Sequence, residues 1–198
     1  MAAVYGLTYD KRNRTFMPTD GSVFGFVQSV PLYADKPFID NTFRFSTYHE
    51  FNENYVGSGK IFLSAINGLN DEDVRLSKRK SLSTRRLRGF SKGKIGPVDG
   101  NDHIGGNYAA AVNFDVNLPN LLPDSSNTDV SFFVDFGNVW EVDYDDSLDD
   151  SNKLRSSTGI NASWISPIGP MTFTLATNLS KASTDTTESF NFNLGTSF

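Results

Sequence analysis

Apolar and polar side chains alternate along most of this chain, and the alternation is clearest at its end. Residues 188–198 read ESFNFNLGTSF. Successive side chains of an extended strand point to opposite faces, so this segment has one apolar face and one small polar face. The apolar face carries Phe190, Phe192, Leu194 and Phe198. The other face carries Asn191, Asn193 and Gly195.

The same period of two recurs along the chain and predicts about nine strands in all, with the terminal segment as the last. Each strand is close to the ~9–11 residues that cross a bilayer at a tilt, whereas the apolar runs are far shorter than the ~20 residues of a spanning helix. The eight earlier segments are marked by apolar residues of one parity: Tyr5 to Tyr9, Phe24 to Leu32, Phe43 to Phe51, Ile61 to Ala65, Tyr108 to Leu118, Val130 to Phe136, Ile160 to Trp164, and Met171 to Leu179.

The polar faces distinguish between two all-β architectures. A soluble sandwich turns its polar face outward and usually fills it with Lys and Glu. Here several polar faces consist of Asn, Ser, Gly and Thr, which are typical of a wet barrel interior, and the apolar faces are rich in aromatic rings. The pattern favours a transmembrane antiparallel β-barrel, with a soluble antiparallel sandwich as the alternative.

The connections between the segments alternate in length. Short ones are predicted at Asn52–Tyr55 and Ser166–Pro170, and long ones from Asn67 to Ile104 and from Glu141 to Lys153. Such alternation is expected when one rim of a barrel faces the periplasm and the other the exterior. An odd number of strands places the first and last in parallel, so antiparallel pairing cannot close the sheet. We therefore expect the chain to be part of a larger barrel.

The connection between residues 67 and 104 is much longer than ordinary loops, and such loops are usually functional or disordered. Its second half places Arg88, Gly89 and Phe90 among further glycines, which let a backbone fold tightly against a wall. An arginine inside a barrel needs an acceptor, because an unpaired buried charge is costly. Asp135, in FFVDFGNVW, has the inward parity and is the predicted acceptor of a two-pronged bond from Arg88.

Five motifs in the same order resemble the outer-membrane assembly factors of the BamA type, and the resemblance covers nearly the whole chain. They are YDKRNRTFMPTDG, LRGF followed by KIGP, FVDFG, LRSSTGINASWISPIGPMTFTLA and FNFNLGTSF. The LRGF and KIGP pair is similar to the signature of the sixth extracellular loop of that family. FVDFG is similar to its Asp-bearing strand, and FNFNLGTSF to its closing strand.

The resemblance implies an organisation and a site. In that family a 16-stranded barrel follows periplasmic POTRA domains, so residues 1–198 would be its last nine strands without POTRA domains. Arg88, Gly89 and Phe90 would form the tip of a loop that folds into the lumen and contacts Asp135. The terminal strand would border a lateral seam. Its implied seam residues are Phe190, Phe192, Leu194, Gly195, where the strand is prone to bend, and Phe198 at the end.

The implied function is insertion of β-barrel proteins into the outer membrane of a Gram-negative bacterium, as part of a BAM complex. It needs no enzyme chemistry, cofactor or metal. The implied partners are client β-barrel precursors, periplasmic accessory lipoproteins, and outer-membrane lipid with lipopolysaccharide. Two alternatives remain: a two-partner-type secretion pore of the same superfamily, and a passive porin or structural barrel.

Other function classes find little support in the residues. His49 and His103 are far apart and lack a neighbouring Cys or carboxylate pair, which argues against an enzyme. The acidic run Asp143–Asn152 lacks the Gly and final Glu of a calcium loop. Cysteine is absent, which excludes disulfides and thiolate metal sites. The basic residues near Lys80 sit in a chain of net charge −5, so we expect lipid headgroup contact rather than nucleic acid.

Overall fold

The computed structural model describes residues 1–195 except 16, 119–120, 124–127 and 167–168. Nine strands form one antiparallel sheet in the order β1-β2-β3-β4-β7-β8-β9-β10-β11. The strands are β1 (Ala2–Asp10), β2 (Gly21–Pro31), β3 (Phe38–Asn52), β4 (Tyr55–Gly68), β7 (Tyr108–Leu118), β8 (Thr128–Trp140), β9 (Arg155–Ser166), β10 (Gly169–Ser180) and β11 (Phe190–Leu194). The alternation of apolar residues therefore predicted both the all-β class and the number of strands in this sheet.

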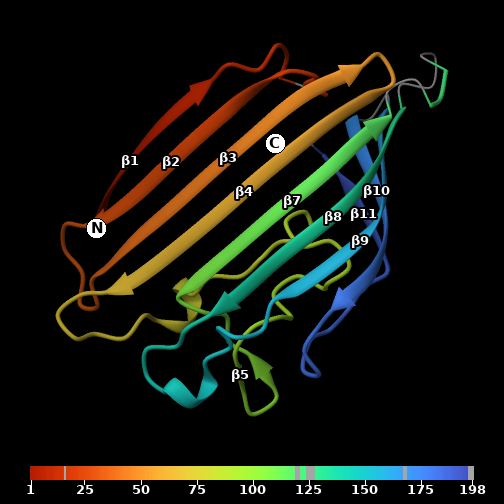
Figure 1. Ribbon diagram of the computed structural model, residues 1–198. Helices are drawn as coiled ribbons and strands as arrows, with labels where there is room; N and C mark the ends of the chain where they lie inside the picture. The colour runs from red at the N-terminus through yellow and green to blue at the C-terminus, as the bar shows by residue number, and fades with distance from the viewer. Residues whose placement is uncertain (16, 119–120, 124–127, 167–168, 196–198) are drawn as a thin grey trace.

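The sheet curves into a trough whose two edges are β1 and β11 (Figure 1). Within the described residues no ladder joins these two edge strands, as expected for part of a barrel. The connection between β4 and β7 runs through the hollow behind the sheet (Figure 1). It contains a short 3-10 helix, η1 (Leu76–Lys78), and a two-stranded ribbon of β5 (Val98–Asp99) and β6 (Asp102–His103).

The two shortest connections of the sheet and the two longest lie at opposite ends of the strands. The β3–β4 hairpin closes with Asn52 paired to Tyr55, and the β9–β10 hairpin with Ser166 paired to Gly169. The other end carries the long β4–β7 connection and the β8–β9 connection with η3 (Asp146–Leu148). The β10–β11 connection lies at that end too. Among the described residues, no helix is long and apolar enough to span a membrane.

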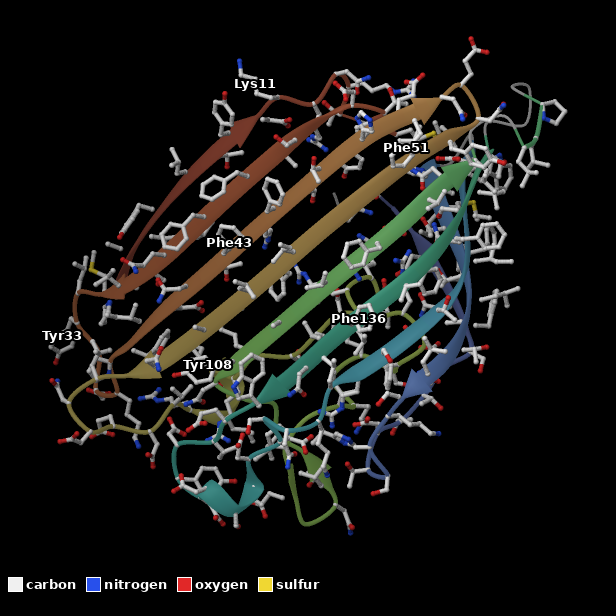
Figure 2. The ribbon with its side chains drawn as sticks, viewed as in Figure 1. Lys11, Tyr33, Phe43, Phe51, Tyr108 and Phe136 are labelled. Atoms are coloured by element: carbon white, nitrogen blue, oxygen red, sulfur yellow. The ribbon has the colours of Figure 1, made fainter. Side chains whose placement is uncertain are left out.

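The two faces of the sheet differ as the alternation requires. On β8, Phe133 and Asp135 point into the hollow and are at most 2% exposed, whereas Phe132 between Ser131 and Phe133 is 53% exposed. Figure 2 shows Phe43 and Phe136 on the convex face, turned away from the loop. Apolar residues of the convex face stay uncovered on most strands: Leu7, Ile61, Leu63, Phe114, Val116, Phe132, Ile160, Leu175, Phe190 and Phe192.

The buried apolar core lies between the β4–β7 connection and the inner wall of the sheet. Leu82, Leu87, Phe90 and Ile95 come from the connection. Phe62, Ala109, Ala111 and Val139 come from strands β4, β7 and β8. The small alanines of β7 leave room for the larger loop side chains, so the connection packs closely on the wall.

Candidate functional site

Arg88 lies at the centre of a buried ion-pair cluster on the inner wall. Its Nε donates to Asp135 Oδ2 at 2.7 Å and its Nη2 to Asp135 Oδ1 at 2.6 Å. The backbone N–H of Arg88 adds a third bond to Oδ2 at 3.0 Å. The guanidinium therefore meets Asp135 as a two-pronged fork, the geometry in which charge-assisted hydrogen bonds are strong. The Asp135 side chain is fully buried.

A second carboxylate, that of Asp115, accepts a hydrogen bond from the remaining guanidinium nitrogen of Arg88. Nη1 donates to Asp115 Oδ1 at 2.7 Å, and Lys60 Nζ donates to the other oxygen of Asp115 at 3.1 Å. These three residues and Asp135 carry two positive and two negative charges, so the cluster is neutral. Neutrality matters because an uncompensated charge at this depth would be costly.

The strand register explains why these groups meet. Asn113 on β7 pairs directly with Asp135 on β8. The Asn113 side-chain amide donates to Asp135 Oδ1 at 2.7 Å and to the carbonyl oxygen of Arg86 at 2.9 Å. Asp115 stands two residues along β7, opposite Phe133, and the Arg88 guanidinium lies 3.7 Å from the Phe133 ring centroid. The inner wall thus places carboxylate oxygens beside the face of an aromatic ring, and a guanidinium can bind both.

The pKa of Arg88 reflects this environment. Burial alone would lower the pKa of the guanidinium. The hydrogen bonds that Arg88 donates to Asp135 and the negative charges of Asp115 and Asp135 outweigh that effect and raise the pKa above its ordinary value. Arg88 is therefore a permanent cation in this cluster.

Gly89 occupies a position that only glycine fills without strain. Its φ is +86°, and an added Cβ would lie 3.1 Å from Ala176 Cβ and 3.2 Å from Asn178 Nδ2 on β10. Its carbonyl oxygen accepts a hydrogen bond from Asn178 Nδ2 at 2.8 Å. The hydroxyl of Ser157 on β9 donates to the preceding carbonyl, that of Arg88, at 2.5 Å. The loop tip is thus pressed against two adjacent strands.

Phe90 turns from this polar cluster into the apolar core. It is 2% exposed and belongs to the cluster of buried residues with Leu87 and Ile95. It also forms an isolated antiparallel bridge with Thr187, in the β10–β11 connection. The structure therefore brings together Arg88, Gly89, Phe90 and Asp135. That they act as a lock on the loop stays a prediction.

The residues expected at the seam lie at the edge of the sheet. Phe190, Phe192 and Leu194 are on the convex face and about half exposed, and β11 pairs with β10 along five residues, Phe190 to Leu194. Gly195 has φ +113° and donates its N–H to the carbonyl oxygen of Pro170 at 2.9 Å. Phe198 lies outside the described residues. Arg88 of the loop tip and Gly195 line the same pocket, and β10 contacts both the loop tip and β11.

Sequence reasoning missed several members of the Arg88 cluster: Lys60, Asn113, Asp115 and Phe133. Asp115 had an available signal, because it is a carboxylate of inward parity on the strand next to that of Asp135. Lys60 has the same parity on β4. Among the described residues, no group of three or more His, Asp or Glu side chains is placed to hold a metal ion.

A curved antiparallel sheet with an apolar convex face and charged and polar side chains on its concave face has the arrangement of an outer-membrane β-barrel. The chain belongs to the Omp85 superfamily, whose domain matches residues 1–198. This family membership confirms the predicted outer-membrane location.

Named relatives agree with the BamA-type resemblance. The outer membrane protein assembly factor BamA of Neorickettsia risticii is 27% identical over the whole chain. That of Neisseria meningitidis serogroup B is 31% identical over 57% of the chain. The crystal structure of BamA from Haemophilus ducreyi lacking POTRA domains 1–3 superposes with a TM-score of 0.89, at 27% identity, over 96% of this chain and 41% of that one. The chain spans 27% and 17% of the lengths of the two sequence relatives.

Proposed function

We propose that this chain is the C-terminal part of the barrel domain of a factor that assembles β-barrel proteins into the outer membrane. The proposal rests on the superfamily match over residues 1–198 and on relatives that are named as assembly factors. The observation that carries it is the docking of the loop tip inside the barrel wall, where Arg88 binds both Asp115 and Asp135.

The mechanism requires no covalent chemistry. An unpaired backbone N–H or C=O group costs several kcal/mol in hydrocarbon, so an incoming strand gains free energy by adding to an exposed strand edge. The terminal strand β11 is short: its ladder with β10 covers Phe190 to Leu194, whereas β10 pairs with β9 along almost its full length. In the complete barrel this strand would border a lateral seam at which client strands pair.

The loop would act as an internal brace for that seam. Arg88 and Gly89 tie residues 87–90 to strands β7, β8, β9 and β10, the last of which holds β11. We propose that POTRA domains and the other strands precede residues 1–198 in the complete protein. Its proposed partners are client β-barrel precursors, periplasmic accessory lipoproteins, and outer-membrane lipid with lipopolysaccharide.

The test uses the full-length protein in lipid vesicles and follows folding of a client β-barrel by its heat-modifiable migration on gels. Asp135→Asn and Arg88→Ala should each slow client folding by about tenfold, equivalent to about 1.4 kcal/mol of lost stabilisation. Asp10→Asn is the matched control, because among the described residues Asp10 pairs with its near neighbour Arg12, away from the Arg88 cluster. Unchanged client folding in both test variants would reject the brace.

A separate measurement addresses the secretion pore and the passive porin. Single-channel conductance of the full-length protein should stay low in the wild type, because the loop packs against the inner wall of the sheet. It should rise in Arg88→Ala. A high and steady conductance in the wild type would favour a passive pore over an assembly factor.

A further inference from the structure

The connection between β10 and β11 runs alongside the Arg-Gly-Phe loop tip. Glu188 donates its N–H to the carbonyl oxygen of Gly89 at 3.1 Å, and Ser91 donates its N–H to that of Thr186 at 3.0 Å. These two bonds flank the bridge between Phe90 and Thr187. A third bond, from the Thr186 N–H to the Lys94 carbonyl oxygen at 3.0 Å, extends the contact. The loop tip is therefore joined by backbone bonds to residues just before the terminal strand.

A second buried arginine holds this connection from its other side. Arg155, the first residue of β9, donates from Nε to Asp185 Oδ2 at 3.0 Å and from Nη2 to Asp185 Oδ1 at 2.8 Å. Both side chains are fully buried. Asp185 Oδ2 also accepts the N–H of Ala182 at 2.6 Å, which closes the turn of the connection around the carboxylate. Asp185 directly precedes Thr186, the residue that bonds to the loop.

The remaining donors of Arg155 fix the neighbouring connection. Nη1 donates to Asn138 Oδ1 on β8 at 2.5 Å and to the carbonyl oxygen of Lys153 at 3.1 Å. Nη2 also pairs with Asp150, in the β8–β9 connection. Arg155 thus joins β8, β9 and two connections at one end of the barrel. Its cluster shares no residue with the Arg88 cluster.

From these contacts we propose that Arg155 and Asp185 are positioning residues that hold the start of the terminal strand against the Arg-Gly-Phe loop tip. The inference rests on the proposed assembly function in one respect: that function gives this contact a role at the lateral seam. Both arginine clusters involve the start of β9. Arg155 is its first residue, and Ser157, two residues later, donates to the Arg88 carbonyl oxygen. Release of either arginine therefore weakens the backbone bonds between residues 89–94 and 186–188.

This arrangement couples the loop to the terminal strand in both directions. Loss of Asp185 removes the group that orders residues 182–186, so the partners of Gly89 and Ser91 become mobile. Loss of the Arg88 anchor frees residues 88–91, so Thr186 and Glu188 lose their backbone partners. Coupling free energies between two sites are reciprocal, so we expect each substitution to change amide exchange at the other site.

The experiment measures amide hydrogen exchange in the full-length protein in lipid vesicles, without a client. Asp185→Asn keeps the shape of the side chain but removes its charge. It should raise the exchange rates of the Ser91, Thr186 and Glu188 amides about tenfold, while amides of the β3–β4 ladder stay unchanged. Arg155→Lys keeps the charge but loses the two-pronged fork, and should show the same local pattern. Arg88→Ala should raise exchange at Thr186 and Glu188.

Asp10→Asn serves as the charge-matched control and should change none of these rates. Unchanged exchange at residues 91, 186 and 188 in Asp185→Asn and Arg155→Lys would overturn the proposal. A rise spread evenly over the sheet would overturn it too, because it would show a merely structural role. Since no client is present, this result is independent of client folding, and failure of the assembly function would be seen in that separate assay alone.

Discussion

Lys60 on β4 and Arg88 in the loop bind the same carboxylate, one at each oxygen of Asp115. The shared carboxylate places a strand of the wall, a neighbouring strand and the loop in one ion-pair network. The Lys60 side chain is 39% exposed, whereas that of Arg88 is 10% exposed. The two contacts therefore differ in how much solvent weakens them, and this difference can be tested.

Asp115→Asn should destabilise the barrel much more than Lys60→Met. Removal of the Asp115 charge leaves Arg88 with one carboxylate in a buried site, and breaking a buried pair costs roughly 3–5 kcal/mol. Lys60→Met leaves the Arg88–Asp115 pair intact, and because the Lys60 side chain is 39% exposed, solvent can compensate the remaining negative charge, so the expected cost is about 1 kcal/mol or less. Urea unfolding of the full-length protein in vesicles measures both. Equal losses would contradict the central place of Arg88.

Gly89→Ala should displace the loop tip, with Gly93→Ala as its control. Both glycines have positive φ, +86° and +67°, so alanine meets a backbone cost of roughly 1–2 kcal/mol at either position. Only at position 89 would the new Cβ crowd Ala176 and Asn178, since nothing lies within 4 Å of the Cβ position at 93. Limited proteolysis should cut the loop of Gly89→Ala faster. Similar cleavage of the two variants would show that close packing is unimportant.

The apolar half of the loop should matter as much as its arginine. Leu87 is 1% exposed in the core between loop and wall, and Leu87→Ala should cost about 2–5 kcal/mol through lost burial and the cavity left behind. Leu76, on the 3-10 helix η1, is 63% exposed, so Leu76→Ala should change the unfolding free energy by less than about 0.5 kcal/mol. Unfolding curves of the two variants measure both changes in the free energy of unfolding. A neutral Leu87→Ala would mean that ion pairs alone hold the loop.

The strands were predictable because their environment imposes a period of two. Phe132 and Phe133 illustrate this point: one faces outward and one inward, and only the surrounding residues reveal which. Parity also indicated Asp135 as an inward-facing acceptor, although β8 carries a second carboxylate of the same parity, Asp129. Family membership then accounts for the BamA-type motifs in their order.

The other contacts of the two arginine clusters could not be predicted, because they join segments that are far apart in the sequence. Asp115 reaches Arg88 because of the register that sets Asn113 beside Asp135, and alternation within one strand does not determine that register. Arg155 binds Asp185, 30 residues later, because the β10–β11 connection folds back onto the loop. Nothing in the local sequence of Asp185 marks it as the partner of a buried arginine.

The β8–β9 connection should keep its local structure at mildly acidic pH. Partial burial would raise the pKa of Asp149, but hydrogen bonds from Ser151 and from the backbone N–H of Glu141 outweigh it and lower the pKa below 3.8. A carboxyl group with a depressed pKa in the folded state contributes stability above its unfolded pKa and loses it as the pH falls through the folded value. Exchange of the Glu141 amide, corrected for its intrinsic pH dependence, should therefore show constant protection from pH 7 to about pH 5 and lose protection only below about pH 4.

Asp149→Asn removes this titrating group. In this variant, protection of the Glu141 amide should no longer change below about pH 4, while exchange in the β3–β4 ladder follows the wild type. A loss of protection that begins near neutral pH in the wild type would contradict the assignment to a carboxyl group with a lowered pKa.

Gly195→Ala tests the bend at the end of the terminal strand against a matched glycine at the same end of the barrel. Gly195 and Gly169 have φ of +113° and +125°, and nothing lies within 4 Å of the Cβ position of either. Alanine therefore meets a similar backbone cost in both, without a clash. Only Gly195 follows β11, where its N–H bonds to the Pro170 carbonyl. If the bend serves the seam, Gly195→Ala should slow client folding about threefold, about 0.7 kcal/mol, while Gly169→Ala leaves the rate near that of the wild type. Equal rates in the two variants would mean that the positive φ of Gly195 is a feature of the strand end and has no part in assembly.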